Sequence, residues 1–128
     1  MNRQTRPRVL VVDNDEDVCL YLRKKLAEAG YETTSTWSGI EALNLLKTVT
    51  FDLLVVDDYL SDLYIGQFLQ KLSNVPVCPR IFVMRTSSQN TLQARGSPVF
   101  ICIDKNCASK ILEALIDKDE SGPQSRTH

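Results

Sequence analysis

Several features that would identify a protein class are missing from this chain of 128 residues. Histidine occurs once, at His128, and the four cysteines show no C-x-x-C spacing, so a zinc site is not expected. The longest apolar runs, Val18–Leu22 and Val99–Ile103, are too short to span a membrane. No hydrophobic segment of signal-peptide length follows the basic N-terminus, so we expect no membrane association and a cytoplasmic location.

The chain also has no large excess of charge of either sign. Lys and Arg total 15 and Asp and Glu total 16, a net charge of -1, which argues against direct nucleic-acid binding through bulk positive charge. The sequence contains no G-x-G-x-x-G or Walker pattern, so a small nucleotide-binding α/β enzyme has no support. With 43% hydrophobic residues, the chain has the composition of one ordinary globular domain.

The cysteines are expected to be reduced, because no export signal precedes them. Cys19 falls in a helical pattern and Cys102 in an apolar strand pattern, where small buried thiols are common. We therefore expect both to be buried, with Cys102 and Phe100 on the same strand face in the core.

Short apolar runs alternate with segments of helical period along the chain. Strands are predicted at Arg8–Val12, Tyr31–Thr36, Phe51–Val56, Ile81–Met84 and Val99–Ile103. Helices are predicted at Glu16–Ala29, from Ser38 to about Thr48, at Tyr64–Leu72 and at Ala108–Lys118, with at most a short helix in residues 85–98. One domain, residues 8–118, is thus expected between an N-terminal extension, 1–7, and a disordered tail, 119–128.

Local signals mark the ends of these helices. Asp15 is placed to cap the first helix, and Gly30 follows it where a left-handed residue belongs. Ser38 and Glu41 have the spacing of a capping box at the start of the second helix.

Five strands alternating with helices predict an open parallel sheet with helices on both faces. Parallel strands joined by right-handed crossovers present their carboxyl ends to one edge. Asp13, Asp57, the Arg85-Thr86 pair and Lys105 each follow a different predicted strand. The sequence therefore predicts that these residues meet at one crevice.

Converging carboxylates repel each other unless a cation lies between them. Oxygen ligands favour a hard ion such as Mg²⁺, which is satisfied by one or two carboxylates, waters and a phosphate. A lysine opposite can pair with a phosphoryl oxygen, and a carboxylate can act as the nucleophile that forms an aspartyl-phosphate.

The runs VLVVDND, SGIEAL, FDLLVVDD and FICIDK resemble the receiver domain of bacterial two-component response regulators. The resemblance covers about residues 8–118. It implies a flavodoxin-like (βα)5 three-layer sandwich with a five-stranded parallel sheet in the order 2-1-3-4-5.

The resemblance also implies roles for individual residues. Asp57 resembles the phosphoacceptor, and Lys105 matches the lysine that contacts the phosphoryl group. A hydroxyl residue normally ends the fourth strand. Thr86 is the nearest hydroxyl here, although counting along the strand places Arg85 at that position.

A magnesium site is implied in the same way. Asp13 matches the first residue of an acidic pair that binds Mg²⁺ together with Asp57, and the backbone carbonyl of Tyr59 matches a third ligand. The second acidic position is Asn14, which removes a charge, although its amide can offer an oxygen or cap the first helix.

Other positions depart from the family pattern. Besides Asn14 and Arg85, the departures are Ser61 for a proline, Ile65 for a glycine, Cys102 for the aromatic switch residue and Asn106 for a proline. Arg85 is either exposed or in a salt bridge with Asp57, and Asp58 is interpreted as a solvated loop acid outside the site.

Two functions are consistent with these observations. The first is a receiver that takes a phosphoryl group from a histidine kinase or histidine phosphotransfer protein and signals to a downstream protein target. It would use the face of residues 85–98, strand Val99–Ile103 and helix Ala108–Lys118 (the fourth helix, fifth strand and fifth helix), which can also form a homodimer. It would not be an enzyme beyond Mg²⁺-dependent self-phosphorylation and autodephosphorylation.

The second function is a pseudo-receiver that binds protein partners independently of phosphorylation, as the departures from the family pattern favour. In either case, only about ten residues follow the last predicted helix, so we expect output through protein contacts unless the chain is a fragment.

Overall fold

The computed structural model describes residues 6–86, 92, 95–106 and 113. Five strands form one parallel sheet in the order β2-β1-β3-β4-β5, as the sequence predicts. The strands are β1 (Arg8–Val12), β2 (Glu32–Thr36), β3 (Leu53–Asp57), β4 (Arg80–Arg85) and β5 (Ile101–Asp104). The helices are α1 (Glu16–Glu28), α2 (Gly39–Thr48), α3 (Ile65–Lys71) and the 3-10 turn η1 (Leu72–Asn74).

Some predictions concern segments beyond the described residues. These are the N-terminal residues 1–5, half of the segment 85–98, nearly all of the predicted helix Ala108–Lys118 and the tail 119–128. Within the described part of the chain, no helix is long and apolar enough to cross a membrane.

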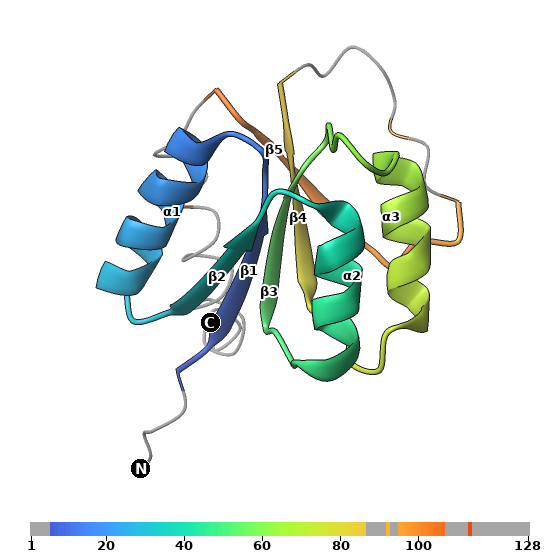
Figure 1. The fold of residues 1–128 in the computed structure, drawn as a ribbon, viewed down its shortest axis with the longest axis horizontal. Coiled ribbons are helices and arrows are strands. Elements are labelled where there is room, and N and C mark those ends of the chain that lie inside the picture. The colour runs from blue at the N-terminus through green and yellow to red at the C-terminus, as the bar shows by residue number, and fades with distance from the viewer. Residues whose placement is uncertain (1–5, 87–91, 93–94, 107–112, 114–128) are drawn as a thin grey trace, which may run out of the picture.

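The sheet separates two apolar cores, which produces the layered arrangement in Figure 1. Leu10 and Val12 of β1 pack with α2 and α3, whereas Val9 and Val11 of the same strand pack with α1. Successive side chains of a strand point to opposite faces, so a central strand covered on both sides must be apolar throughout. This explains why the three central strands, β1, β3 and β4, contain continuous apolar runs.

The predicted helix ends are confirmed. Asp15 is the N-cap of α1, and its side chain accepts from the backbone N–H groups of Asp17 (3.0 Å) and Val18 (3.4 Å). Gly30 has a φ of 96°, a left-handed conformation that glycine adopts without steric cost.

The predicted capping box at α2 forms only in part. Ser38 Oγ accepts from the N–H of Glu41 at 2.9 Å. The Glu41 carboxylate, however, accepts from the Thr36 hydroxyl instead of the Ser38 N–H. That N–H donates to Thr36 Oγ1 at 3.1 Å, so the last residue of β2 is tied to the start of α2.

The expectation that Cys102 lies in the core is wrong. β5 is the edge strand, and its side chains alternate, with Ile103 buried and Cys102 and Asp104 exposed. Phe100 is half-buried and packs against the α2–α3 core. Cys19 is half-buried rather than fully buried, and Cys19, Cys78 and Cys102 all carry free thiols.

The strand register carries on past the strand ends and fixes the residues that follow. Asp57 pairs with Met84, and the N–H of Asp58 donates to Met84 O at 2.9 Å. The N–H of Lys105 likewise donates to Arg85 O at 2.8 Å. The backbone of the carboxyl edge is therefore held by the same ladder as the sheet.

Candidate functional site

The lysine that follows β5 joins the ends of two central strands. Lys105 Nζ lies 2.9 Å from Asp13 Oδ2 and 3.1 Å from Asp57 Oδ1. Asp13 directly follows β1, and Asp57 is the last residue of β3, next to it in the sheet. The structure thus confirms the predicted convergence of these three residues.

The cluster is shielded from solvent. The side chains of Asp13, Asp57 and Lys105 are 0%, 6% and 13% exposed. Asp13 Oδ1 accepts from the backbone N–H of Asp15 at 2.9 Å. Asp13 Oδ2 and Asp57 Oδ1 accept no other hydrogen bond from the described residues, so the Lys105 ammonium is the group that balances their charge. Two carboxylates therefore share one positive charge.

This charge imbalance determines the protonation properties of the site. Burial, followed by the nearby charge of Asp13, raises the pKa of Asp57 to about 6, although Lys105 opposes the shift. Burial alone would lower the pKa of Lys105, but its contacts with Asp13 and Asp57 outweigh burial and raise that pKa. The site therefore favours a cationic lysine and disfavours a second unneutralised carboxylate.

The donor atoms fit a hard divalent cation. Asp13 and Asp57 supply carboxylate oxygens, and Asn14 is exposed at the same edge. Within the described segments, no three His, Cys, Asp or Glu side chains group around a common point. The site thus offers two carboxylates, and Mg²⁺, which commonly retains several waters, needs no more. The side chain of Tyr59 is exposed, so Tyr59 could contribute to such a site only through its backbone carbonyl oxygen.

Arg85 forms an ion pair with Asp58. Its Nε lies 3.4 Å from Asp58 Oδ2, and these side chains are 16% and 17% exposed. Neither alternative for Arg85, exposure or a salt bridge with Asp57, is found, and the interpretation of Asp58 as a solvated acid is wrong. Because Asp57 pairs with Met84, the next residues along the two strands, Asp58 and Arg85, project to the same side of the sheet.

Thr86 is exposed at the end of β4. Together with Arg85, Cys102, Ile103 and Asp104, it lines a hollow of about 310 Å³ between the ends of β4 and β5. Its assignment as the hydroxyl that contacts the phosphoryl group stays a prediction.

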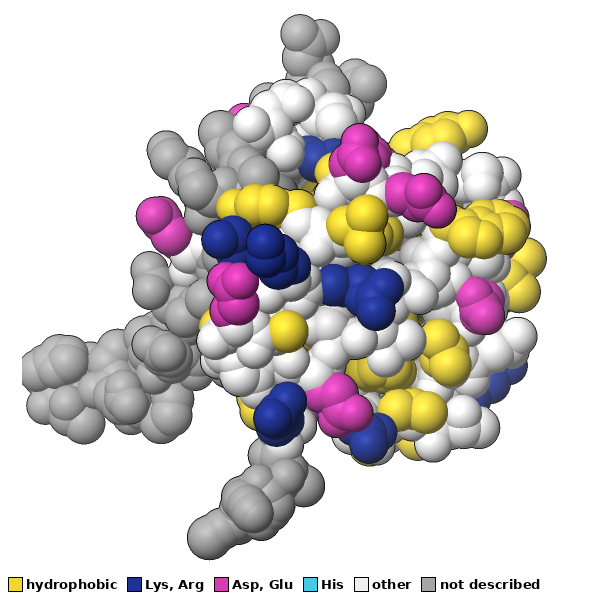
Figure 2. Space-filling model, turned by 60° about the vertical axis from the view of Figure 1, so that its left-hand side comes forward, with side chains coloured by type: hydrophobic (Ala, Val, Ile, Leu, Met, Phe, Trp, Pro, Cys, Tyr) yellow, Lys and Arg dark blue, Asp and Glu magenta, His cyan; other side chains and the backbone are white. Residues whose placement is uncertain are grey.

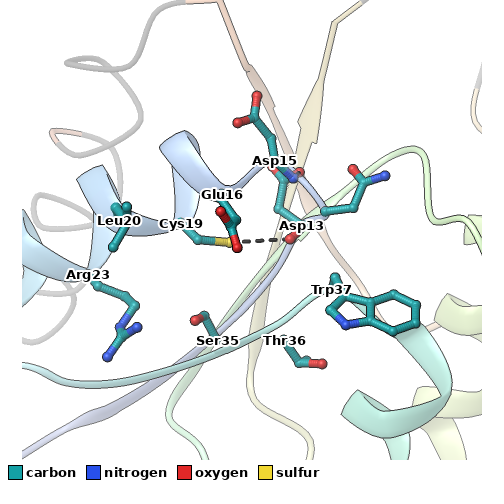
Figure 3. A pocket seen from close by; sticks show the side chains of 10 residues that line it. Asp13, Asp15, Glu16, Cys19, Leu20, Arg23, Ser35, Thr36 and Trp37 are labelled. Carbon is teal, nitrogen blue, oxygen red and sulfur yellow. Dashed lines mark hydrogen bonds between the residues drawn. The ribbon is translucent and has the colours of Figure 1, made fainter.

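A larger hollow of about 700 Å³ opens beside Asp13, between α1 and the β2–α2 connection. Figure 3 shows Asp13 and Asp15 near the start of α1 and Trp37 across from them. The Cys19 thiol donates to the backbone carbonyl of Asp13 at 3.2 Å. Burial, Asp13 and Asp15 raise the pKa of Cys19 to about 11, so this thiol stays protonated and is not a reactive nucleophile.

The sequence reasoning missed two acidic residues near the site. Asp58 is expected to be a loop residue, but it lies opposite Arg85, because the β3–β4 register continues one residue past Asp57. Asp62 had no apparent role, yet its carboxylate accepts from Ser38 Oγ at 2.6 Å and from Gly39 N at 3.0 Å. Asp62 is more than twenty residues away from these partners in the sequence, so no local sequence motif predicts the contact.

Comparisons with known proteins agree with this geometry. The family model of the response regulator receiver domain matches residues 9–117. The uncharacterized transcriptional regulatory protein YrkP of Bacillus subtilis is 37% identical over 73 residues, which cover 55% of this chain and 31% of YrkP. The chain spans about a third of the length of the first curated relatives that it matches.

Solved structures share the fold. A two-component response regulator from Clostridium difficile matches with a TM-score of 0.73 and 26% identity, over 87% of this chain and 93% of that chain. The receiver domain of the sensor histidine kinase PA1611 from Pseudomonas aeruginosa matches with a TM-score of 0.77 and 14% identity, over 89% and 97% of the two chains. That crystal structure has a magnesium ion coordinated in its active-site cleft.

Proposed function

Because this chain belongs to the response regulator receiver domain family, we propose that it accepts a phosphoryl group on Asp57 from a histidine kinase or a histidine phosphotransfer protein. The observation that carries the proposal is the Lys105 ammonium, which lies within 3.1 Å of Asp57 Oδ1 and 2.9 Å of Asp13 Oδ2. A nucleophilic carboxylate, a second acid and a fixed cation are the groups that this reaction needs at one place.

Asp57 is the nucleophile in this proposal. One of its oxygens attacks the phosphorus of a phosphohistidine, a phosphorus–oxygen bond forms, and the phosphorus–nitrogen bond breaks. The imidazole of the donor leaves with that electron pair and takes a proton from water. Lys105, held by the backbone bond of its N–H to Arg85 O, can pair with a phosphoryl oxygen without a change in the strand ladder.

A divalent cation belongs to the same proposal. Asp13, Asp57, the carbonyl oxygen of Tyr59 and the amide oxygen of Asn14 would hold Mg²⁺, with fewer charges than a site that has two acids after β1. Bound Mg²⁺ supplies positive charge to the phosphoryl oxygens. The shared charge of Asp13 and Asp57, only partly balanced by Lys105, supports a cation here.

We expect a downstream protein target, contacted through the fourth helix, fifth strand and fifth helix, and that face can also form a homodimer. On the face in Figure 2, acidic and basic side chains are interspersed, which does not favour a nucleic-acid partner. A cytoplasmic location and no enzymatic activity beyond self-phosphorylation and autodephosphorylation complete the proposal.

The pseudo-receiver is the second candidate, and the Arg85–Asp58 pair favours it. A large ion-paired side chain stands where the family has a small hydroxyl, so the response to phosphorylation would have to differ from that of a typical receiver. In this alternative the chain binds its protein partner equally well with or without a phosphoryl group.

The two candidates are separated by mass spectrometry of the intact protein after incubation with Mg²⁺ and acetyl phosphate. The receiver proposal expects one phosphoryl adduct that Asp57→Asn abolishes. Asp52→Asn is a matched control, because Asp52 is exposed and precedes the first residue of β3, at the end of the strand opposite to Asp57. A folded protein without any adduct would contradict the receiver proposal, and partner binding unaffected by Asp57→Asn would favour the pseudo-receiver.

A further inference from the structure

The loop after Asp57 is fastened to a neighbouring helix by one carboxylate. Asp62 lies in the β3–α3 loop and accepts from three donors at the start of α2. These are Ser38 Oγ at 2.6 Å, the N–H of Gly39 at 3.0 Å and the N–H of Ile40 at 3.2 Å. Asp62 therefore accepts hydrogen bonds from residues more than twenty positions earlier in the sequence. These donors include the first N–H groups of α2, which have no partner within that helix.

Capping α2 does not by itself account for this contact. The helix already has its own N-cap, because Ser38 Oγ accepts from the N–H of Glu41 at 2.9 Å. Asp62 satisfies two further N–H groups and also fixes the position of its own loop. The hydrogen bond from Ser38, followed by those from Gly39 and Ile40, holds the pKa of Asp62 below its usual value.

A second contact holds the same loop close to α2. Leu60 is buried in the α2–α3 core, and a Cβ placed on Gly39 would lie 2.9 Å from Leu60 Cδ1. The side chains of this loop therefore pack closely over the first residue of α2, and a larger residue at position 39 would require the Leu60 side chain to shift. Leu60 and Asp62 together anchor the loop within a few residues of Asp57 and Tyr59.

The anchor also connects to Asp13. The N–H of Asp13 donates to Thr36 O at 3.0 Å, and the N–H of Ser38 donates to Thr36 Oγ1 at 3.1 Å. One short segment, residues 36–38, is therefore bonded to Asp13 on one side and to Asp62 on the other. The two loops that carry the proposed metal ligands meet at this segment.

We propose that Asp62 is a positioning residue, which holds the backbone of Asp58 and Tyr59 in register with Asp13 for cation binding. The inference rests on the proposed function, because that function makes the Tyr59 carbonyl a ligand. Ser61 gives this loop no covalent restraint, so the hydrogen bonds of Asp62 supply the rigidity. Preorganised ligands bind a metal more tightly because less conformational entropy is lost on binding.

Two measurements test this proposal in the full chain. Hydrogen exchange of the Asp58 N–H, which donates to Met84 O at 2.9 Å, reports on the loop without any metal. Titration calorimetry with MgCl₂ reports on the site. In Asp62→Ala, we expect exchange at Asp58 to be faster by about tenfold, with a similar loss of Mg²⁺ affinity, as removal of a charge-assisted hydrogen bond predicts. Asp62→Asn keeps one acceptor oxygen and should be intermediate.

Asp52→Ala is the matched control. Asp52 also joins distant segments, since Asp52 Oδ2 accepts from the N–H of Arg8 at 2.7 Å, but it does so at the amino edge of the sheet. Asp52→Ala should leave Asp58 exchange and Mg²⁺ affinity within about twofold of wild type.

The outcomes separate this inference from the proposed function. If the wild-type chain does not bind Mg²⁺, the metal part of the proposed function is contradicted. Hydrogen exchange at Asp58 then tests by itself whether Asp62 holds the loop in place. Unchanged Asp58 exchange in Asp62→Ala overturns the inference. Unchanged Mg²⁺ affinity in Asp62→Ala, with a wild type that binds the ion, overturns it too, as does an equal effect of Asp52→Ala.

Discussion

Arg85 Nε lies 3.4 Å from Asp58 Oδ2, in a pair of which each side chain is less than a fifth exposed. A second pair in the protein has the same separation but a different environment. Arg8 Nε is 3.4 Å from Glu32 Oε1, and those side chains are 48% and 60% exposed. The two pairs therefore differ in burial rather than in distance, and comparing them isolates the effect of burial.

Removing Arg85 should destabilise the protein more than removing Arg8. In Arg85→Ala, the carboxylate of Asp58 is left shielded and without its partner, and we expect a loss of about 1–3 kcal/mol in unfolding free energy. Arg8→Ala should cost less than about 1 kcal/mol. Urea unfolding of both variants makes the comparison. Equal losses would show that the Arg85–Asp58 pair behaves as a surface ion pair.

Neutralising Asp57 should stabilise the protein at neutral pH. Its pKa is raised to about 6 by burial and by Asp13, so the folded protein binds this proton more tightly than the unfolded chain does. Protonated Asp57 makes its full contribution to the free energy of unfolding below about pH 4. That contribution is lost as the pH rises through about 6.

Asp57→Asn removes this loss, because the amide carries no charge at any of these pH values. We expect the variant to exceed wild type by roughly 2–3 kcal/mol at pH 7 and to equal it near pH 4. Thermal and urea unfolding at both pH values, with Asp52→Asn as the control, measure the difference. A variant less stable than wild type at pH 7 would contradict the charge imbalance in the site.

The charge of Lys105 should set how far the pKa of Asp57 rises. In Lys105→Met, the ammonium that opposes the repulsion by Asp13 is gone, so the pKa of Asp57 should increase above about 6. Lys105→Arg keeps the positive charge and should leave the value close to that of wild type. Carbon-13 NMR titration of the aspartate carboxyls follows the change. The same pKa in Lys105→Met as in wild type would mean that the two side chains do not interact in solution.

Restoring a second acid after β1 should strengthen cation binding. Asn14→Asp adds a carboxylate at the exposed position next to Asp13, and we expect Mg²⁺ to bind about tenfold more tightly, which corresponds to about 1.4 kcal/mol. Asn44→Asp introduces the same charge on the exposed side of α2, away from the site, and serves as the control. Titration calorimetry measures both affinities. An equal gain in the two variants would indicate a general charge effect instead of a ligand at residue 14.

Local sequence signals predict much of this fold, because the elements are set by short-range chemistry. Asp15 caps α1, Gly30 ends it with a positive φ, and the apolar run of β1 serves both cores. The meeting of Asp13, Asp57 and Lys105 follows from parallel topology, since every strand in such a sheet ends at the same edge.

The details that escaped prediction depend on register and on burial. Which acid pairs with Arg85 depends on a one-residue alignment between β3 and β4, which alternation of apolar residues cannot define when both faces are buried. The exposure of Cys102 depends on the position of β5 at the sheet edge. The contact of Asp62 with α2 depends on loop geometry, which has no periodic signal.

Asp57 is the residue that we propose receives the phosphoryl group. The most direct test treats the Mg²⁺- and acetyl phosphate-incubated protein with borohydride, which reduces an aspartyl phosphate to homoserine, and locates that residue by peptide mass spectrometry. We expect homoserine at position 57 in wild type and none there in Asp57→Asn. Homoserine at Asp13 or Asp58, or at no position in a folded protein that binds Mg²⁺, would contradict it.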